Sequence, residues 1–300
     1  MRAFITGADG FVGRHLRAFL ESSGDVVDGA DRECDVTNAT SVRDVFEGSR
    51  PEVIYHLAAL THVGESWSNP VEFTRVNVLG TTNVLDAASA IVPDATVVLV
   101  SSADVYGVVG ERDLPLRETF RVAPANPYAS SKVEAERAAH EAVRTRGQRV
   151  VIARPFNHVG PGQSTQFVVP ALVNRLLDAV ESGAETIAVG DLSARRDFSD
   201  VRDVVRAYRL LAKHGLDGET YNIASGRDVG LEDVAAMLVQ DLAPSVRLVP
   251  DESLMRPVEI PVMRGSFEKL HETTGWEPTI ALEQSLRDVI DELRVRRTTN

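Results

Sequence analysis

The sequence has almost no cysteine and no long apolar run. Cys34 is the only cysteine among 300 residues, so no disulfide can form within the chain, which fits a reducing compartment. The opening MRAFITGADGF has no apolar segment ahead of a cleavage site, and it predicts a first strand in place of a signal peptide. No apolar run approaches the roughly 18 residues that span a membrane. We therefore expect a cytoplasmic protein with no membrane segment.

Basic residues are outnumbered by acidic ones, 32 to 44. The formal net charge of -12 argues against non-specific binding to nucleic acid. Arginine nevertheless far outnumbers lysine, and the planar guanidinium suits phosphate oxygens. The possibility that one pocket binds an anionic ligand therefore stays open. The sequence predicts no metal site.

Strands and helices alternate through the first half of the chain. Apolar strands are predicted at residues 2–6, 26–31, 53–57, 96–101 and 149–153, and helices at residues 10–20, 37–46, 73–90 and 127–146. This alternation implies an α/β fold with a doubly wound, parallel Rossmann sheet. Glycine and proline then cluster at residues 155–162 and the alternation is lost, although residues 219–225 predict one more strand that returns to the sheet.

Three glycines follow the first strand and open the first helix. Gly7, Gly10 and Gly13 are spaced GxxGxxG, where a tight turn and a helix N-terminus suit the phosphates of a dinucleotide. The alternative is a glycine-rich turn without a ligand. The position directly after a strand favours binding of NAD(H) or NADP(H).

The end of the second strand predicts the adenosine site. Asp31 lies where an acid accepts ribose hydroxyls, whereas Arg32 could meet a 2′-phosphate, so the choice between NADH and NADPH stays open. Asp35 and Val36 could flank the adenine. The predicted cofactor-binding residues are Gly7, Gly10, Phe11, Val12, Gly13, Asp31, Arg32, Asp35, Val36, Leu57, Ala58, Ala59, Tyr128, Lys132 and Pro155.

We expect two interleaved parts. Residues 1–160 form an NAD(P)-binding Rossmann domain, to which residues 198–226 return. Residues 161–197 and 227–300 form a smaller α/β lobe for the substrate. No linker composition separates the two parts.

Tyr128 and Lys132 lie four residues apart at the start of a predicted helix, and so share one face of it. A nearby ammonium stabilises tyrosinate and lowers the tyrosine pKa from about 10 toward neutrality. Ser102 ends the apolar central strand, where ligands bind in open α/β sheets. Each residue alone is unremarkable, but beside a nucleotide loop the three predict a hydride-transfer site with Tyr128 as the proton donor or acceptor.

These segments together resemble a known family. The glycine loop, SSADVYG and YASSK are similar to extended short-chain dehydrogenase/reductases that act on nucleotide sugars. The resemblance implies that Lys132 also holds the nicotinamide ribose and that Ser102 orients the substrate. RPFNHVGPGQ, RRDFSDVRD and RGSFEKLHETTGWEP resemble the GDP-mannose branch, with its 4,6-dehydratases and 4-keto reductases.

The same resemblance implies the substrate site. Asn157, Arg196 and Arg256 would face the diphosphate, and Glu259 the guanosine ribose, while Val168 would also contact the substrate. Arginine forks pair with phosphate oxygens, and a carboxylate can accept two hydroxyl hydrogen bonds. Without the resemblance, surface ion pairs would be the simpler interpretation of these arginines.

Asp104 bears on the choice of reaction. A dehydratase needs an extra carboxylate for acid–base work, and similar dehydratases carry glutamate two residues before the Tyr-Gly of SSADVYG. The shorter Asp104 there favours reduction of the C4 ketone of GDP-4-dehydro-6-deoxy-D-mannose to GDP-D-rhamnose. A GDP-mannose 4,6-dehydratase is the alternative, and a nucleotide-sugar 4-epimerase or a non-catalytic NAD(P)-binding sensor are weaker ones.

The resemblance further implies a homodimer through a four-helix bundle. Its seam would use Val76, Leu79 and Val84 on one helix and Ala135, Ala138 and Ala142 on the next. The alternative is that these side chains face the sheet.

Overall fold

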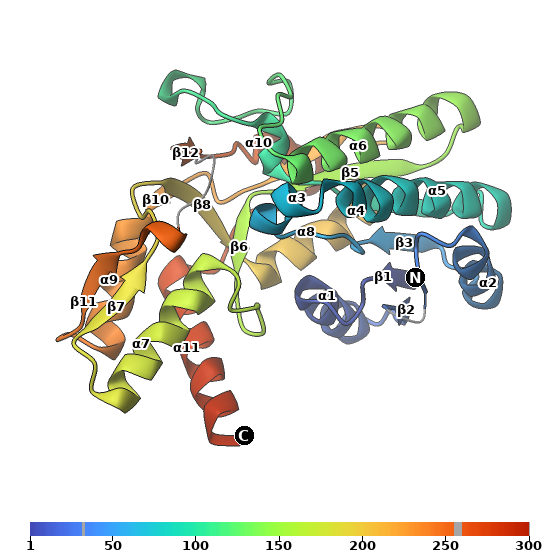
Figure 1. Cartoon of the computed structure of the whole chain (residues 1–300). Helices are drawn as coiled ribbons and strands as arrows, with labels where there is room; N and C mark the ends of the chain where they lie inside the picture. Colours follow the sequence, from blue (N-terminus) through green and yellow to red (C-terminus); the bar gives the residue numbers. More distant parts are fainter. Residues whose placement is uncertain (32–33, 255–259, 300) are drawn as a thin grey trace.

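Six parallel strands form the central sheet (Figure 1). The computed structural model describes residues 1–31, 34–254 and 260–299. Every neighbouring pair of strands in this sheet is parallel, so the predicted doubly wound Rossmann sheet is confirmed. In spatial order the strands are β2 (Val26–Ala30), β1 (Arg2–Thr6), β3 (Val53–His56), β4 (Thr96–Val100), β5 (Val150–Pro155) and β9 (Thr220–Ile223).

The strand order reverses between β1 and β3. The chain runs outward from β1 to β2 and then crosses to β3 on the other side of β1. In open α/β sheets a crevice forms at such a switch point, beyond the carboxyl ends of the strands. The fold therefore places a binding crevice beside the glycine turn that follows β1.

Helices cover both faces of the sheet, as strands that are apolar on both sides require. Their buried faces form two separate apolar cores, one on each side of the sheet. One face is covered by α1 (Phe11–Ser22), α8 (Val201–His214) and α10 (Glu268–Thr274), and the other by α2 (Ala39–Ser49), α5 (Gly80–Ile91) and α6 (Pro127–Arg146).

Short helical segments fill the connections around the sheet. Two of them, α4 and the π-helical turn η1, run directly into α5. These segments are α3 (Val63–Ser68), α4 (Pro70–Thr74), η1 (Arg75–Leu79), η2 (Ala103–Tyr106), η3 (Glu111–Asp113) and η4 (Glu252–Leu254).

The turn η1 lies inside the helix that was predicted over residues 73–90. Asn77 in this turn is buried, and its amide nitrogen donates to the carbonyl of Leu60 at 3.0 Å and to the hydroxyl of Ser131 at 2.9 Å. Its side-chain oxygen accepts from the backbone N–H of Leu60 at 2.8 Å. Such wide turns are frequent at functional sites. Here the turn ties the loop after β3 to α6.

A smaller second part lies at one end of the sheet, on the left of Figure 1. Its apolar core is separate from the two cores of the sheet. It contains the strands β6 (Asn157–Val159), β8 (Arg195–Asp200), β10 (Asp228–Gly230) and β12 (Val262–Met263), the pair β7 (Thr186–Val189) and β11 (Arg247–Pro250), and the helices α7 (Val168–Ser182), α9 (Leu231–Leu242) and α11 (Leu282–Thr299).

The chain passes repeatedly between the two parts. β6 follows β5 with no helix between them, and α8 follows β8 directly and returns to the large sheet. β9 then pairs with β5, so the strand predicted within residues 219–225 does return to the sheet.

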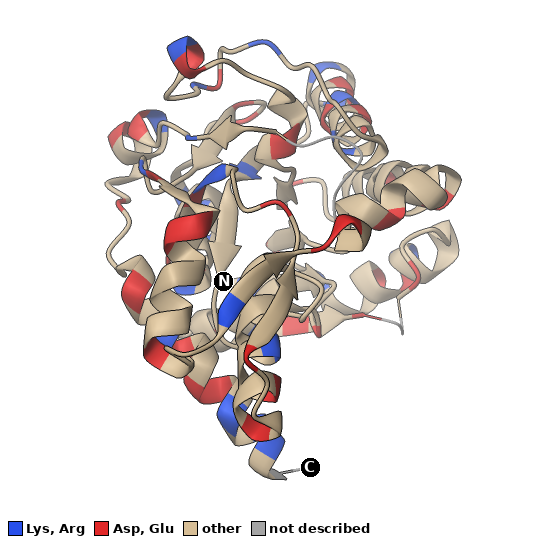
Figure 2. Ribbon diagram, turned by 60° about the vertical axis from the view of Figure 1, so that its left-hand side comes forward, with Lys and Arg blue, Asp and Glu red and all other residues tan. Residues whose placement is uncertain are grey.

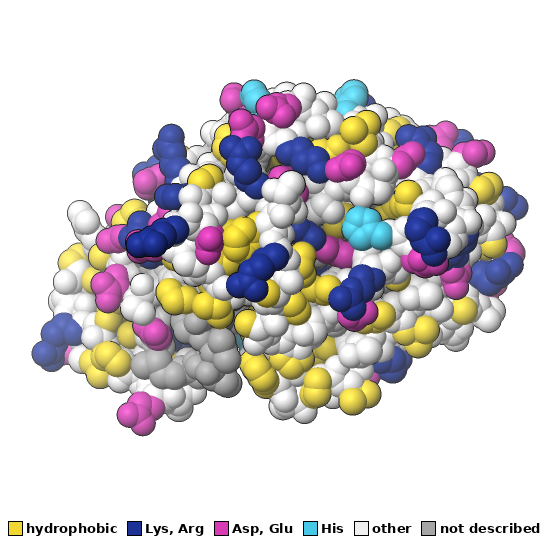
Figure 3. Space-filling model, turned by 90° about the horizontal axis from the view of Figure 1, so that it is seen from above, with side chains coloured by type: hydrophobic (Ala, Val, Ile, Leu, Met, Phe, Trp, Pro, Cys, Tyr) yellow, Lys and Arg dark blue, Asp and Glu magenta, His cyan; other side chains and the backbone are white. Residues whose placement is uncertain are grey.

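Acidic and basic residues are interspersed on the outer helices (Figure 2), and side chains of both signs lie among one another on the face seen from above (Figure 3). On α6, Arg137 pairs with Glu134 and Arg144 with Glu141, each within one helical turn. Among the described residues, no helix combines the length and apolar character needed to cross a membrane.

Three of the six residues predicted for the dimer seam are buried within the protomer. Val84, Ala135 and Ala142 are each at most 2% exposed. Val84 and Ala142 belong to the core that α5 and α6 form against the sheet. The prediction is therefore wrong for these three residues, because side chains that are buried within one protomer are not available to a partner. Leu79, in contrast, is 45% exposed.

Candidate active site

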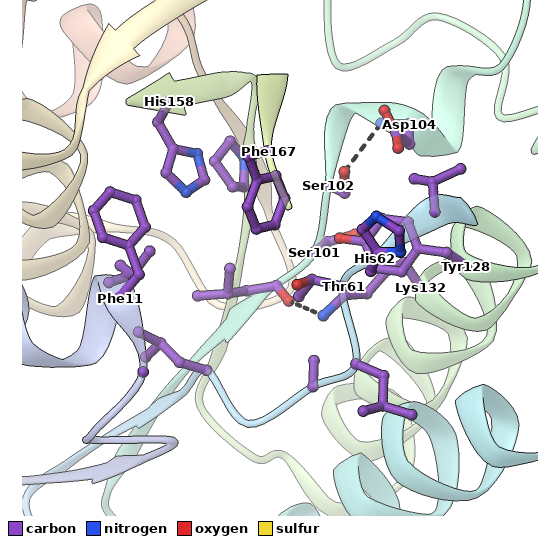
Figure 4. A pocket seen from close by; sticks show the side chains of 18 of the residues that line it. Phe11, Thr61, His62, Ser101, Ser102, Asp104, Tyr128, Lys132, His158 and Phe167 are labelled. Carbon is purple, nitrogen blue, oxygen red and sulfur yellow. Dashed lines mark hydrogen bonds between the residues drawn. The ribbon is translucent and has the colours of Figure 1, made fainter. Parts of the chain in front are cut away.

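One cavity of about 780 Å³ lies at the carboxyl ends of the parallel strands, between the sheet and the second part (Figure 4). All predicted site residues that the structure describes line this cavity. They are Gly7, Gly10, Phe11, Val12, Gly13, Asp31, Asp35, Val36, Leu57, Ala58, Ala59, Ser102, Asp104, Tyr128, Lys132, Pro155, Asn157, Val168 and Arg196. Arg32, Arg256 and Glu259 lie outside the described residues.

The glycine turn leaves no room for side chains. Gly7 has a φ of +72°, and a Cβ atom on it would lie 2.9 Å from the backbone nitrogen of Ala58. A Cβ atom on Gly13 would lie 2.2 Å from the carbonyl oxygen of Gly7. Gly10 caps α1, so the free N–H groups of the first helical turn face the cavity region. This backbone cradle fits the pyrophosphate of a dinucleotide.

The region after β2 forms the adenosine end of the predicted cofactor site. Asp35 accepts hydrogen bonds from the backbone N–H and the hydroxyl of Thr37, at 2.9 and 2.7 Å, and these bonds lower the pKa of its carboxyl. The carbonyl of Val36 is held by the side chain of Asn83 at 2.9 Å. Both cavity-lining residues are thus fixed in place before a ligand arrives.

The start of α6 positions Tyr128. Asn126 caps the helix, and its side chain accepts from the backbone N–H of Ala129 at 2.7 Å. Pro127 occupies the first turn, where its missing N–H costs nothing. Tyr128 follows Pro127 in this first turn and is buried at the cavity wall, with only 7% of its surface exposed.

Ser102 approaches Tyr128 from the end of β4. Its hydroxyl accepts from the backbone N–H of Asp104 at 3.2 Å and so caps η2 (Figure 4). The same side chain lies beside Tyr128 in the cavity wall and acts to lower the pKa of its phenol. The structure therefore brings together two hydroxyl groups that the sequence placed far apart.

Tyr128 does not have the lowered pKa that the sequence predicted. Burial raises the pKa of Tyr128, the charge of Asp104 raises it further, and the neighbouring Ser102 side chain only partly opposes this. The Lys132 ammonium instead donates to the carbonyl of Val100 at 2.8 Å. In this structure the tyrosine is therefore a neutral phenol.

Lys132 is the more easily titrated member of the pair. Burial lowers the pKa of its ammonium to about 8, although the nearby carboxylate of Glu136 raises it. His56, on the neighbouring strand β3, is fully enclosed, and burial lowers the pKa of its imidazole to about 3. His56 is therefore neutral at physiological pH.

Several cavity-lining residues were missed by the sequence prediction. His158 donates its Nδ1–H to the carbonyl of Phe156 at 3.1 Å, and burial lowers the pKa of the ring. Its Nε2 atom is therefore an acceptor. The His158 ring is parallel to that of Phe11 at a centroid distance of 6.0 Å. The position directly after Asn157 was the one available sequence signal for this histidine.

His62 and Phe167 belong to opposite walls of the cavity and were also missed. Their rings meet edge to face with centroids 6.5 Å apart (Figure 4). His62 follows β3, whereas Phe167 precedes α7 in the second part. Neither residue has a sequence pattern that distinguishes it from other loop residues.

The predicted diphosphate residues lie on the second part's side of the cavity. Arg196 in β8 is 9% exposed, and its guanidinium donates to the carbonyl of Arg195 at 2.9 Å. Asn157 in β6 is paired with Phe198 of β8, so β6 and β8 present these two predicted residues to the same cavity.

Comparison with known proteins shows the family of the chain. A family model described as "NAD dependent epimerase/dehydratase family" matches residues 3–224. GDP-6-deoxy-D-mannose reductase of Pseudomonas aeruginosa is 39% identical and covers 98% of both chains. GDP-6-deoxy-D-talose 4-dehydrogenase of Aggregatibacter actinomycetemcomitans is 32% identical over 98% of this chain and 97% of its own.

Solved structures resemble the whole chain as well. The structure of RMD from Pseudomonas aeruginosa complexed with NADPH has a TM-score of 0.91 and 36% identity, and covers 99% of this chain and 100% of its own. UDP-glucose 4-epimerase of Thermus thermophilus in complex with NAD has a TM-score of 0.87 and 27% identity, and covers 98% of this chain and 99% of its own. The predicted resemblance is confirmed: the chain belongs to the NAD dependent epimerase/dehydratase family, that is, to the extended short-chain dehydrogenase/reductases.

Proposed function

We propose that this protein is an oxidoreductase that reduces the C4 ketone of GDP-4-dehydro-6-deoxy-D-mannose with NAD(P)H and forms GDP-D-rhamnose. The observation that carries the proposal is one shared cavity, in which Ser102, Tyr128 and Lys132 lie beyond the glycine turn. The 39% identity to a GDP-6-deoxy-D-mannose reductase along nearly the whole chain supports this choice of substrate.

The bound nicotinamide supplies the hydride in such a reduction. Gly7, Gly10 and Gly13 would hold the pyrophosphate, while Lys132 and Pro155 would lie at the nicotinamide end. The cradle that excludes Cβ atoms at Gly7 and Gly13 supports the first assignment. Residues 1–160, with 198–226, would form the cofactor domain, and residues 161–197 and 227–300 the substrate lobe.

Tyr128 gives the proton. Because burial raises its pKa, the phenol is protonated at neutral pH and can donate to the ketone oxygen as this becomes an alcohol. Ser102, which lines the same cavity as Tyr128, donates to the same oxygen and orients it. The Lys132 ammonium stabilises the tyrosinate that remains after the transfer.

Arg196 and Asn157 would bind the diphosphate of the sugar nucleotide, and Val168 would pack against it. All three line the cavity on the side of the second part. A guanidinium that is held in place loses little further freedom when it pairs with phosphate oxygens. Arg256 and Glu259 remain predicted ligands of the nucleotide.

A GDP-mannose 4,6-dehydratase is the second candidate. Asp104 lines the cavity, and its charge acts on Tyr128, so a carboxylate is present where acid–base chemistry would need one. Aspartate is shorter than the glutamate of similar dehydratases, and a misplaced catalytic group is costly. We therefore favour the reductase.

The test uses both substrates. The purified protein is mixed with GDP-mannose alone, and separately with GDP-4-dehydro-6-deoxy-D-mannose plus NADPH or NADH, and the products are identified by NMR. We expect oxidation of the reduced cofactor only with the keto sugar, and a product with the manno configuration. GDP-6-deoxy-D-talose would overturn the assigned configuration at C4. Conversion of GDP-mannose to a keto sugar without net cofactor use would establish the dehydratase instead.

We further propose that the protein acts as a cytoplasmic homodimer. The exposed side chains of Leu79, Val71 and Trp67, at 45%, 78% and 42% exposure, support contact through η1, α4 and α3, next to the outer side of α6. Light scattering at micromolar concentration should give twice the chain mass. A monomer mass would contradict the dimer.

A further inference from the structure

A buried ion pair lies directly behind the reactive end of α6. Two nitrogens of Arg154 contact the two carboxylate oxygens of Glu136, at 2.8 and 2.6 Å. The side chains of Arg154 and Glu136 are only 6% and 5% exposed. The hydroxyl of Ser101 donates to the same carboxylate at 2.5 Å. A guanidinium fork and a hydroxyl thus converge on one carboxylate, an arrangement of strong, charge-assisted hydrogen bonds.

The arginine is held from its other side by the SSADVYG segment. A third nitrogen of Arg154 donates to the hydroxyl of Tyr106 at 3.1 Å, and the guanidinium carbon lies 5.0 Å from the centre of the Tyr106 ring. That hydroxyl donates in turn to the side-chain oxygen of Asn222 at 2.7 Å. Glu136 therefore cannot shift without breaking a network that spans β5, η2 and β9.

Lys132 and Glu136 hold neighbouring residues at the end of β4. The Lys132 ammonium donates to the carbonyl of Val100, and the hydroxyl of the next residue, Ser101, donates to Glu136. The two side chains share one face of α6 because they are four residues apart. Ser102 follows at once, so Glu136 contributes to the placement of its hydroxyl.

Charged and titratable groups from four elements act on Lys132 directly or through a neighbour. Glu136 of α6 and His56 of β3 interact with Lys132 itself. Arg154 of β5 pairs with Glu136, and Asp104 of η2 acts on Tyr128. Tyr128 and His56 are neutral at physiological pH, since burial raises the pKa of the phenol and lowers that of the imidazole to about 3. Glu136 raises the pKa of Lys132 and so opposes the effect of burial.

We propose that Glu136 is a positioning residue of the reaction: fixed by Arg154 and Ser101, it keeps Lys132 charged and holds the end of β4 from which Ser102 projects. This inference rests on the proposed function, because it assigns Glu136 a part in the same proton transfer. Lys132, Glu136 and Arg154 together carry one net positive charge. This charge matches the tyrosinate that the transfer leaves on Tyr128.

The protonation of Lys132 can be measured without turnover. The chain has three lysines, Lys132, Lys213 and Lys269, so carbon-13 NMR of labelled lysine side chains gives few signals. In Glu136→Gln we expect the Lys132 midpoint to fall by about one pH unit, a tenfold change in the proton equilibrium. The matched control is Glu134→Gln, an exposed residue of the same helix, which should leave the midpoint unchanged.

A double variant keeps this test decisive. Glu136→Gln leaves Arg154 buried without its carboxylate, and the loss of such a partner is strongly destabilising. The double variant with Arg154→Gln removes both charges, and thermal unfolding shows which variants are folded. In the folded double variant the midpoint should still fall, but less than in the single variant. An unchanged midpoint in any folded variant that lacks Glu136 overturns the proposal.

Kinetics supply the second measurement. For the wild type, kcat/KM for the keto sugar should decline as the pH rises through about 8, where Lys132 loses its proton. In Glu136→Gln this decline should begin at lower pH, and Glu136→Asp should restore most of the profile. A uniform loss at every pH would mean a purely structural role. If the wild type does not reduce the keto sugar, the proposed function fails. The NMR titration still tests whether Glu136 keeps Lys132 protonated.

Discussion

The two faces of α6 carry ion pairs of equal length in opposite surroundings. On the outer face, Arg137 and Glu134 lie 2.6 Å apart with their side chains 71% and 49% exposed. On the inner face, Glu136 lies 2.6 Å from Arg154 of β5, and these side chains are 5% and 6% exposed. The sequence offers both glutamates in the same short stretch, two residues apart.

The contrast shows that contact distance does not measure the importance of an ion pair. Water and salt screen the outer pair, so its net contribution to stability is at most about 1 kcal/mol. The inner pair has lost its hydration, and removal of one partner leaves a buried charge at a cost of about 3–5 kcal/mol. The inner face of α6 is therefore expected to be sensitive to single-atom changes, and the outer face tolerant.

The largest effect should follow from removing one oxygen atom on the inner face. Tyr128→Phe keeps the buried ring but deletes the proton donor, so kcat should fall by roughly 10²–10⁴-fold. Steady-state kinetics with the keto sugar measure this change, with unfolding temperature as the control for folding. Full turnover by Tyr128→Phe would remove the assigned mechanism.

The next effect separates the two ion pairs directly. Arg154→Met should lower the free energy of unfolding by about 3–5 kcal/mol, because Glu136 is left buried and unpaired. Arg137→Met on the outer face should lower it by at most about 1 kcal/mol. Denaturant unfolding of both variants tests the difference. Equal losses would mean that burial does not distinguish the pairs.

A smaller effect concerns stability at alkaline pH. The pKa of Lys132 is lowered from 10.5 to about 8 in the folded protein, so between these values the unfolded chain binds more protons than the folded one. Stability therefore rises with pH in that range. Relative to Lys132→Met, the wild type should gain about 2 kcal/mol between pH 8 and 10, since one pH unit corresponds to at most about 1.4 kcal/mol. A constant difference between the two proteins would contradict the assigned pKa.

The smallest effect should come from salt. Raising the ionic strength to about 1 M shortens the screening length to about 3 Å, which removes most of the attraction between exposed charges. At low salt, a double-mutant cycle should give a coupling energy of about 0.5 kcal/mol between Glu134 and Arg137. At the higher ionic strength this coupling energy should vanish. The coupling of Glu136 and Arg154 should persist, because salt does not enter their surroundings. Equal salt sensitivity would mean that the inner pair is hydrated.

Local pattern was enough to predict the sheet and most of the site. Strand and helix periods are set by near neighbours in sequence, and the glycine turn and Ser102 follow apolar strands whose carboxyl ends meet at one edge. The helix that begins at Pro127 was predicted at its observed bounds because proline and an asparagine cap mark its start.

Contacts between distant segments account for what was missed. The π turn η1 depends on Asn77 meeting Leu60 and Ser131, neither of which its own helix reveals. The pKa of Tyr128 was predicted wrongly because burial and the charge of Asp104 raise it, and both depend on segments outside α6. The Lys132 ammonium donates to the carbonyl of Val100 at the end of β4. The acceptor atom of His158 is likewise decided by the carbonyl of Phe156.

The repeated passage of the chain between its two parts has a consequence for dissection of the molecule. A fragment that ends at residue 160 would lack both α8 and β9, which lie far along the chain. The N–H and C=O groups of β5 that now bond to β9 would become an open edge, and the apolar face under α8 would be exposed. Such a fragment should aggregate when expressed alone. For the same reason, the two sides of the cavity can move apart only if several of the segments that connect the two parts bend at once. This favours small displacements over a wide opening.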